Sequence, residues 1–171
     1  MAVHHLNPPV TVRVFRVAFR PDLDAGPRED IPFGLIGDLR MGPRYAVGLI
    51  ARKSATSAES ARVGRLAKHL VKSPFRTLKA LHADIWGDEA NRPAAFDAAV
   101  RHSHSSLMFL PISDGRSAVD TEGLDFGGDI DGIREWCKNA LRSELRSALD
   151  AWTSDPTVLP IDGTEDLEEA A

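Results

Sequence analysis

The chain has 171 residues, a formal net charge of -4, and 43% hydrophobic and 27% charged residues. This balance is typical of one folded domain and not of a disordered chain, and at this length about 70% of the unfolded surface is buried. No apolar run is long enough for a membrane helix, no secretory signal pattern is present, and a single cysteine excludes an internal disulfide and a thiolate zinc site. We therefore expect a cytoplasmic protein that has no cofactor and does not contact a membrane.

The acidic character lies at the C-terminal end. Residues 153–171 carry six carboxylates and no Lys or Arg, so that removing these six charges from the net charge of -4 leaves residues 1–152 at +2. The same segment contains two prolines and shows no apolar periodicity. We expect a single α+β domain over residues 1–152 and a flexible acidic tail over residues 153–171.

Three strands are predicted near the N-terminus. Residues 10–20 are rich in β-branched and aromatic residues, with apolar side chains on both faces, as in an interior strand. Residues 31–40 and 44–53 are expected to form a hairpin around a short turn. Each contains a mid-strand glycine, Gly34 and Gly48, which we interpret as a bulge or packing gap, or else as a place where a ligand approaches the backbone.

Helices are predicted next. Thr56 and Glu59 have the spacing of a capping box, so a first helix is expected from there to about Lys72. Ser73 and Pro74 have the residue types of an N-cap and a first helical position, and they predict a second helix that ends at residues 86–87. A third, short helix begins at residue 93.

The C-terminal half is expected to contain one more strand and a long helix. Residues 105–113 form a compact apolar run, and residues 114–129 are a loop rich in Gly and Asp. Apolar residues then recur at intervals of three and four over residues 131–152, as in an amphipathic helix. The whole order predicts an α+β fold, with an antiparallel sheet of about four strands covered on one face by helices.

The most unusual feature of the sequence is a purely basic stretch, residues 62–82, which contains six Lys or Arg and no acid. At about 100° per residue, the first four cations fall on one face of the first predicted helix, opposite its apolar residues. Like charges on neighbouring turns repel, so a negative partner is expected opposite them. The cations are Arg62, Arg65, Lys68, Lys72, Arg76 and Lys79.

Three interpretations of this stretch remain open. It is an ordinary solvated surface, a site for the nucleic-acid backbone, or a docking surface for an acidic protein. The acidic tail of the same chain is a further candidate partner and would compete with nucleic acid. A membrane is a poorer partner because the first helix lacks aromatic anchors.

A metal site is a weaker hypothesis. His102 and His104 project from one face if they begin a strand, and the loop that follows gathers three aspartates, Asp125, Asp129 and Asp131. The alternative for these aspartates is that Asp129 or Asp131 caps the long helix. A metal-dependent hydrolase would need both groups.

Three further predictions concern single side chains. Cys137 falls on the apolar stripe of the long helix, where a thiol is buried and inert. Arg13 and Arg16 point to opposite faces of the first strand, so one of them needs a buried carboxylate, for which Asp97 and Glu135 are candidates. Arg16 beside one of the two strand glycines would make a small anion pocket.

No catalytic motif occurs in the sequence, so we expect a binding protein and not an enzyme. The Ala, Arg and Asp bias suggests a bacterial or phage origin. The favoured function is attachment to the nucleic-acid backbone through the basic stretch, and the alternative is an adaptor or inhibitor that docks an acidic protein.

Overall fold

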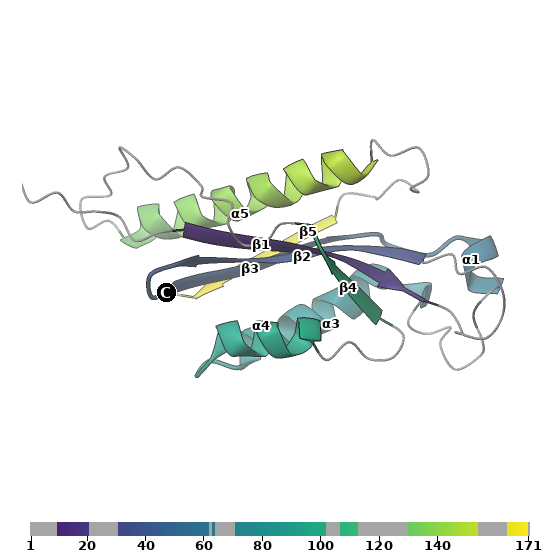
Figure 1. Cartoon of the computed structure of the whole chain (residues 1–171), viewed down its shortest axis with the longest axis horizontal. Helices are drawn as coiled ribbons and strands as arrows, with labels where there is room; N and C mark the ends of the chain where they lie inside the picture. The colour runs from purple at the N-terminus through teal and green to yellow at the C-terminus, as the bar shows by residue number, and fades with distance from the viewer. Residues whose placement is uncertain are drawn as a thin grey trace, which may run out of the picture.

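The computed structural model describes residues 10–20, 31–61, 63, 71–101, 107–112, 130–153 and 164–170. In this part of the chain, an antiparallel sheet lies between two layers of helices (Figure 1). The elements in chain order are β1 (Val10–Phe19), β2 (Ile31–Met41), β3 (Arg44–Ala51), α1 (Ser57–Ala61), α3 (Pro74–Gly87), α4 (Arg92–Arg101), β4 (Leu107–Pro111), α5 (Ile130–Thr153) and β5 (Thr164–Ala170). The predicted α+β fold class is confirmed.

The sheet has the strand order β4-β1-β2-β3-β5, and every neighbouring pair is antiparallel. The three predicted N-terminal strands form its centre. The apolar run after the central helices forms β4, as predicted, and β4 pairs with the free side of β1. The β2–β3 turn contains Gly42 with φ of 58°. Pro43 cannot adopt a positive φ, so Gly42 supplies the left-handed residue that a two-residue hairpin turn requires.

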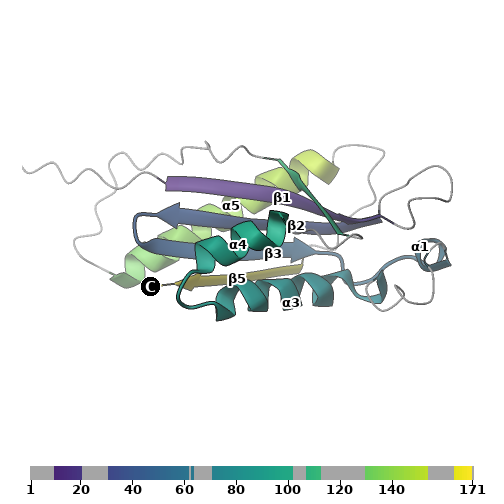
Figure 2. The ribbon, with the colours of Figure 1, turned by 60° about the horizontal axis from the view of Figure 1, so that its bottom comes forward.

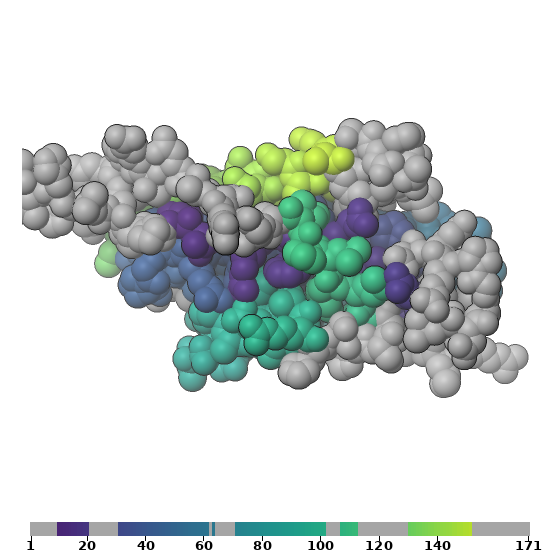
Figure 3. Space-filling model, viewed as in Figure 1, coloured from purple at the N-terminus to yellow at the C-terminus, as the bar shows by residue number. Residues whose placement is uncertain are grey.

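Helices cover both faces of the sheet, and not the single face that the sequence predicted. α5 lies on one face, where Leu141 and Leu145 pack against β1, β2 and β3. α3 and α4 cover the other face, with Leu78 and Phe96 in a second apolar cluster (Figures 1 and 2). In the space-filling view, atoms of β1 and β2 are visible between these two helical layers (Figure 3). The reason is that the central strands are apolar at consecutive positions, and such strands need cover on both sides.

Two helix starts agree with the predicted caps. The Thr56 hydroxyl accepts a hydrogen bond from the Glu59 backbone N–H at 3.2 Å, and the Ser73 hydroxyl accepts one from the Arg76 N–H at 3.4 Å. The first helix is shorter than predicted, because α1 ends at Ala61 and Val63 lies in a bend. The prediction of a single uninterrupted helix that ends at about Lys72 is therefore wrong.

The two mid-strand glycines have different surroundings. At Gly34 the register between β1 and β2 shifts by one residue, which makes a β-bulge, and a Cβ added to Gly34 would lie 2.1 Å from the Ile50 carbonyl oxygen. The interpretation as a bulge is confirmed there. Gly48 pairs directly with Gly37. A Cβ added to Gly37 would lie 3.3 Å from the Leu145 side chain of α5. The absence of a side chain at Gly37 therefore lets α5 approach the sheet closely.

The C-terminal segment differs from the prediction. Residues 164–170 were expected in a flexible tail, but they form β5, which pairs with β3 from Thr164 opposite Ala51 to Ala170 opposite Tyr45. Its composition gave no strand signal, because Glu, Asp and Ala are poor strand formers. Pairing with the open side of β3 supplies the backbone partners that the local sequence does not favour.

Candidate functional site

Three of the six predicted basic site residues lie in the described part of the chain. Lys72 is helical and exposed, and Arg76 and Lys79 are exposed on α3. The other three, Arg62, Arg65 and Lys68, lie outside the described residues. Within the described part of the chain, no carboxylate forms an ion pair with Lys72 or Arg76.

The orientation of α3 explains why these cations face outward. Leu78, His82 and Ile85 are buried on its inner side, and the His82 imidazole Nε2 lies 3.2 Å from the Val47 carbonyl oxygen of β3. Arg76 and Lys79 therefore occupy the opposite side of the helix. The basic stretch predicted these two residues as part of the site without fixing their direction, and the buried side of α3 determines that they face outward.

Two cationic side chains on α3 and α4 lie over aromatic rings. The Lys79 ammonium lies 5.7 Å from the centroid of the partly buried Phe75 ring. Further along, the Arg92 guanidinium lies 3.9 Å from the Trp86 ring centroid, and its Nε donates a hydrogen bond to the Trp86 carbonyl at 2.7 Å. Both distances are within the range of cation–π contacts, which hold a cation against the surface without neutralising it.

The start of α3 is fixed to the sheet by a chain of polar contacts. The Phe75 backbone N–H donates to the Arg52 carbonyl at 2.8 Å. The Arg52 side chain forms two hydrogen bonds of 2.9 Å to the carboxylate of Glu59, and both side chains are buried. In a capping box, the Glu59 carboxylate would accept a hydrogen bond from the Thr56 backbone N–H. Here it accepts hydrogen bonds from the Arg52 side chain and from the Thr56 hydroxyl. These hydrogen bonds connect the start of α3, the helix that carries Arg76 and Lys79, to the end of β3 and to α1.

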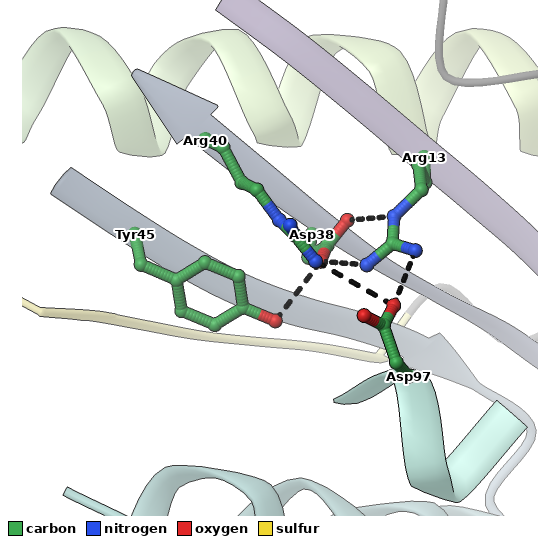
Figure 4. A network of polar contacts seen from close by, with 5 residues as sticks. All are labelled: Arg13, Asp38, Arg40, Tyr45 and Asp97. Atoms are coloured by element: carbon green, nitrogen blue, oxygen red, sulfur yellow. Dashed lines mark hydrogen bonds and ion pairs between the residues drawn. The ribbon is translucent and has the colours of Figure 1, made fainter. Parts of the chain in front are cut away.

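A second polar cluster lies on the same face of the sheet, beside α4 (Figure 4). Its centre is Asp38, whose side chain is 1% exposed. Arg13 donates to both carboxylate oxygens of Asp38, at 3.0 Å and 2.6 Å, and the Tyr45 hydroxyl donates to one of them at 3.0 Å. Arg13 also donates to Asp97 of α4 at 2.5 Å, and Arg40 reaches the same Asp97 oxygen at 3.5 Å.

The electrostatics of this cluster follow from burial and paired charges. Burial and the negative charge of Asp38 raise the pKa of Tyr45, so its hydroxyl stays protonated as a donor. Burial opposes ionisation of Asp97, but hydrogen bonding and the charges of Arg13 and Arg40 outweigh this and lower its pKa. Burial likewise opposes the charge of Arg13, and its bonds to Asp38 and Asp97 reverse the effect and raise its pKa.

The sequence anticipated part of this cluster. Asp97 was one of two candidate partners for Arg13, and this prediction is confirmed, whereas Glu135 is exposed on α5. Asp38 was missed, although it is the only charged residue between Pro32 and Leu39 in an apolar strand. That isolated charge was a usable signal, but choosing its partner requires the β1–β2 register, which places Arg13 directly opposite.

The strand register bears on the predicted anion pocket of Arg16 beside Gly34 or Gly48. The Ile50 carbonyl of β3 lies close to Gly34. In the ladder Arg16 lies opposite Leu35, and Leu35 lies opposite Ile50, so β2 separates Arg16 from the strand that carries Gly48. The register therefore contradicts a pocket beside Gly48. A pocket beside Gly34 stays a prediction, because Gly34 pairs with Val17, the residue next to Arg16.

The proposed metal ligands are largely outside the described residues, namely His102, His104, Asp125 and Asp129. Asp131 is exposed in the first turn of α5, 3.8 Å from the Arg134 guanidinium, where its charge faces the positive end of the helix. In the ranges that the structure describes, no three His, Cys, Asp or Glu side chains gather in a way that would hold a metal ion. Cys137 is buried on the apolar stripe of α5, as predicted.

Comparison with protein families, curated proteins and solved structures gives no match for this chain. Among the described helices, none is long and apolar enough to cross a membrane. The fold is an α+β fold in which an antiparallel sheet is covered by helices on both faces, and α3 carries exposed cations on its outer side.

Proposed function

We propose that this chain is a non-enzymatic binding protein that attaches to the nucleic-acid backbone through the basic surface of α3 and the segment before it. The observation that carries the proposal is the exposure of Arg76 and Lys79 on the outer side of α3, whose inner side is buried, together with the exposed Lys72 just before its N-cap. Cations in this arrangement contact phosphates without disturbing the core. Arg62, Arg65 and Lys68, the other three predicted contacts, lie outside the described residues.

The chemistry of the surface supports backbone contacts and not base reading. Lysine and arginine on the outside of a helix neutralise phosphates and release counterions, which gives affinity with little sequence dependence. The partly buried Phe75 beside Lys79 adds an aromatic edge that would suit single strands. An acidic protein docking on the same cations is the second candidate, and it is separated from the first by the experiment below.

The test is fluorescence anisotropy with labelled duplex DNA, single-stranded DNA and RNA of equal length over a salt series. The intact chain is compared with Arg76→Glu/Lys79→Glu. The matched control is Arg142→Glu/Arg146→Glu, which makes the same charge change at exposed positions of α5, on the opposite face of the sheet. This control separates a local contact from a general effect of net charge.

We expect binding that weakens with salt and is reduced about tenfold or more by the α3 reversal, with a salt slope smaller by about two. The α5 reversal should reduce binding less. Equal losses in the two variants, or no binding of any of the three nucleic acids at low salt, would contradict the proposal. In the second case, an acidic protein becomes the better candidate partner.

A further inference from the structure

The C-terminal strand β5 is an unusual edge strand, because its sequence does not favour the position it occupies. Its seven residues, TEDLEEA, include four carboxylates and no cation. Glu, Asp and Ala are depleted in strands, and a run of like charges repels itself. Residues 154–163 connect the strand to α5.

The strand that β5 covers has the opposite character. From Tyr45 to Ala51 every residue of β3 is buried, and none is charged. One edge of β3 pairs with β2 along its length, and the other pairs with β5. Without β5 this second edge would present unpaired backbone N–H and C=O groups on an apolar strand, which is a ready template for another extended chain.

Charged side chains near this edge affect which extended segments can bind there. α3 contacts both β3 and β5 and lies beside β5 (Figure 2). It carries the exposed cations Arg76 and Lys79 and one exposed acid, Asp84. An extended segment on the β3 edge therefore lies beside a helix whose exposed side carries two cations and one acid. The resident strand has the complementary sign, with four negative charges.

We propose that the β3 edge is a docking site for an extended acidic segment of a partner protein, which adds to the sheet in place of β5. Backbone hydrogen bonds to β3 supply affinity that depends little on sequence, as in other cases of strand addition. The cations of α3 favour acidic segments. β5 is the intramolecular occupant and keeps the edge closed until a partner competes with it.

The experiment uses a fluorescein-labelled peptide of residues 161–171 as the probe. It is titrated against the full-length chain and against full-length Asp166→Pro/Leu167→Pro. Backbone N–H groups of alternate residues face the neighbouring strand, so prolines at two consecutive positions remove one ladder hydrogen bond whatever the phase of the ladder. The variant thus weakens β5 and leaves the rest of the chain unchanged.

We expect the peptide to bind the proline variant at least about tenfold more tightly than the wild-type chain, since the tethered β5 no longer competes at high effective concentration. A peptide that carries the same two prolines should not bind. A peptide in which the four acids are replaced by Gln and Asn should bind several-fold more weakly at low salt. No binding to the folded variant, or equal binding of the proline peptide, would overturn the docking site, and equal binding of the neutral peptide would overturn its preference for acids.

A second measurement keeps the proposal testable if the proline variant does not fold. Hydrogen exchange of the wild-type chain is followed with and without excess unlabelled peptide. Displacement predicts faster exchange of the β5 amides and unchanged protection of β3, because the peptide replaces β5 on the same edge. Unchanged exchange of β5 at saturating peptide would contradict displacement. Neither measurement involves nucleic acid. A negative result would therefore contradict the docking site without affecting the proposed nucleic-acid binding, and the reverse also holds.

Discussion

Asp38 of β2 lies directly opposite Arg13 of β1 and accepts two hydrogen bonds from its guanidinium, at 3.0 Å and 2.6 Å. The pair connects two central strands, and through Asp97 it also connects the sheet to α4. Because the Asp38 side chain is 1% exposed, water cannot replace Arg13 as its partner. This geometry makes Asp38 the position at which loss of charge should be felt most strongly.

Replacing Asp38 by Asn should lower the free energy of unfolding by about 3 kcal/mol, because it leaves the Arg13 charge only partly compensated. Urea unfolding followed by circular dichroism measures the change. Asp97→Asn is the control, since Asp97 bonds to the same arginine but is 31% exposed, and it should cost about 1 kcal/mol or less. Equal losses for the two variants would show that burial is not the reason for the effect.

Tyr45 is the only tyrosine of the chain and predicts a dependence of stability on alkaline pH. Its pKa is raised by burial and by the charge of Asp38. An unfolded tyrosine loses its proton near pH 10, whereas the folded one keeps it, so the unfolded state is favoured as the pH rises above about 10. Below that pH the contribution of Tyr45 to stability is fully present.

We therefore expect Tyr45→Phe to be about 1 kcal/mol less stable than the wild-type chain at neutral pH, through loss of the hydrogen bond to Asp38. This difference should shrink as the pH rises above about 10. Unfolding of both proteins at a series of pH values gives the difference, and tyrosinate absorbance reports ionisation of this one residue. A constant difference over the alkaline range would mean that Tyr45 titrates normally in the folded state.

Gly34→Ala should destabilise the fold by several kcal/mol or prevent folding. A Cβ at this position would lie 2.1 Å from the Ile50 carbonyl oxygen, which belongs to the backbone of β3 and cannot turn away. Gly87→Ala is the matched control, because a Cβ there would meet no described atom within 4 Å beyond its own helix and chain neighbours. It should leave stability within about 1 kcal/mol of wild type. Thermal unfolding of both variants gives the comparison, and similar melting temperatures would contradict the close approach of β2 and β3.

The acids of β5 should weaken nucleic-acid binding, because the strand contacts α3. Combining Glu165→Gln, Asp166→Asn, Glu168→Gln and Glu169→Gln should tighten binding several-fold at low salt, and the gain should disappear at high salt. Anisotropy titrations measure both conditions. The control neutralises Asp131, Glu135, Glu144 and Asp150 on α5 and should have a smaller effect. An equal gain in the control would assign the change to net charge alone.

Much of the local structure could be predicted from the sequence. The caps at Thr56 and Ser73, the apolar period of α5 and the strand character of residues 10–20 depend on neighbouring residues, so their physical causes are visible in the chain itself. The same holds for the outward position of Arg76 and Lys79, which follows from the buried stripe of their own helix. These properties arise from interactions over a few residues.

Tertiary structure alone decided the features that depend on residues distant in sequence. β5 forms because β3 has an open edge, although its own composition argues against a strand. Asp38 is paired because the β1–β2 register places Arg13 opposite it, and Gly34 is required because the Ile50 carbonyl approaches it. Strand register and sheet edges are set by contacts across the whole fold, so no local pattern in the sequence contains them.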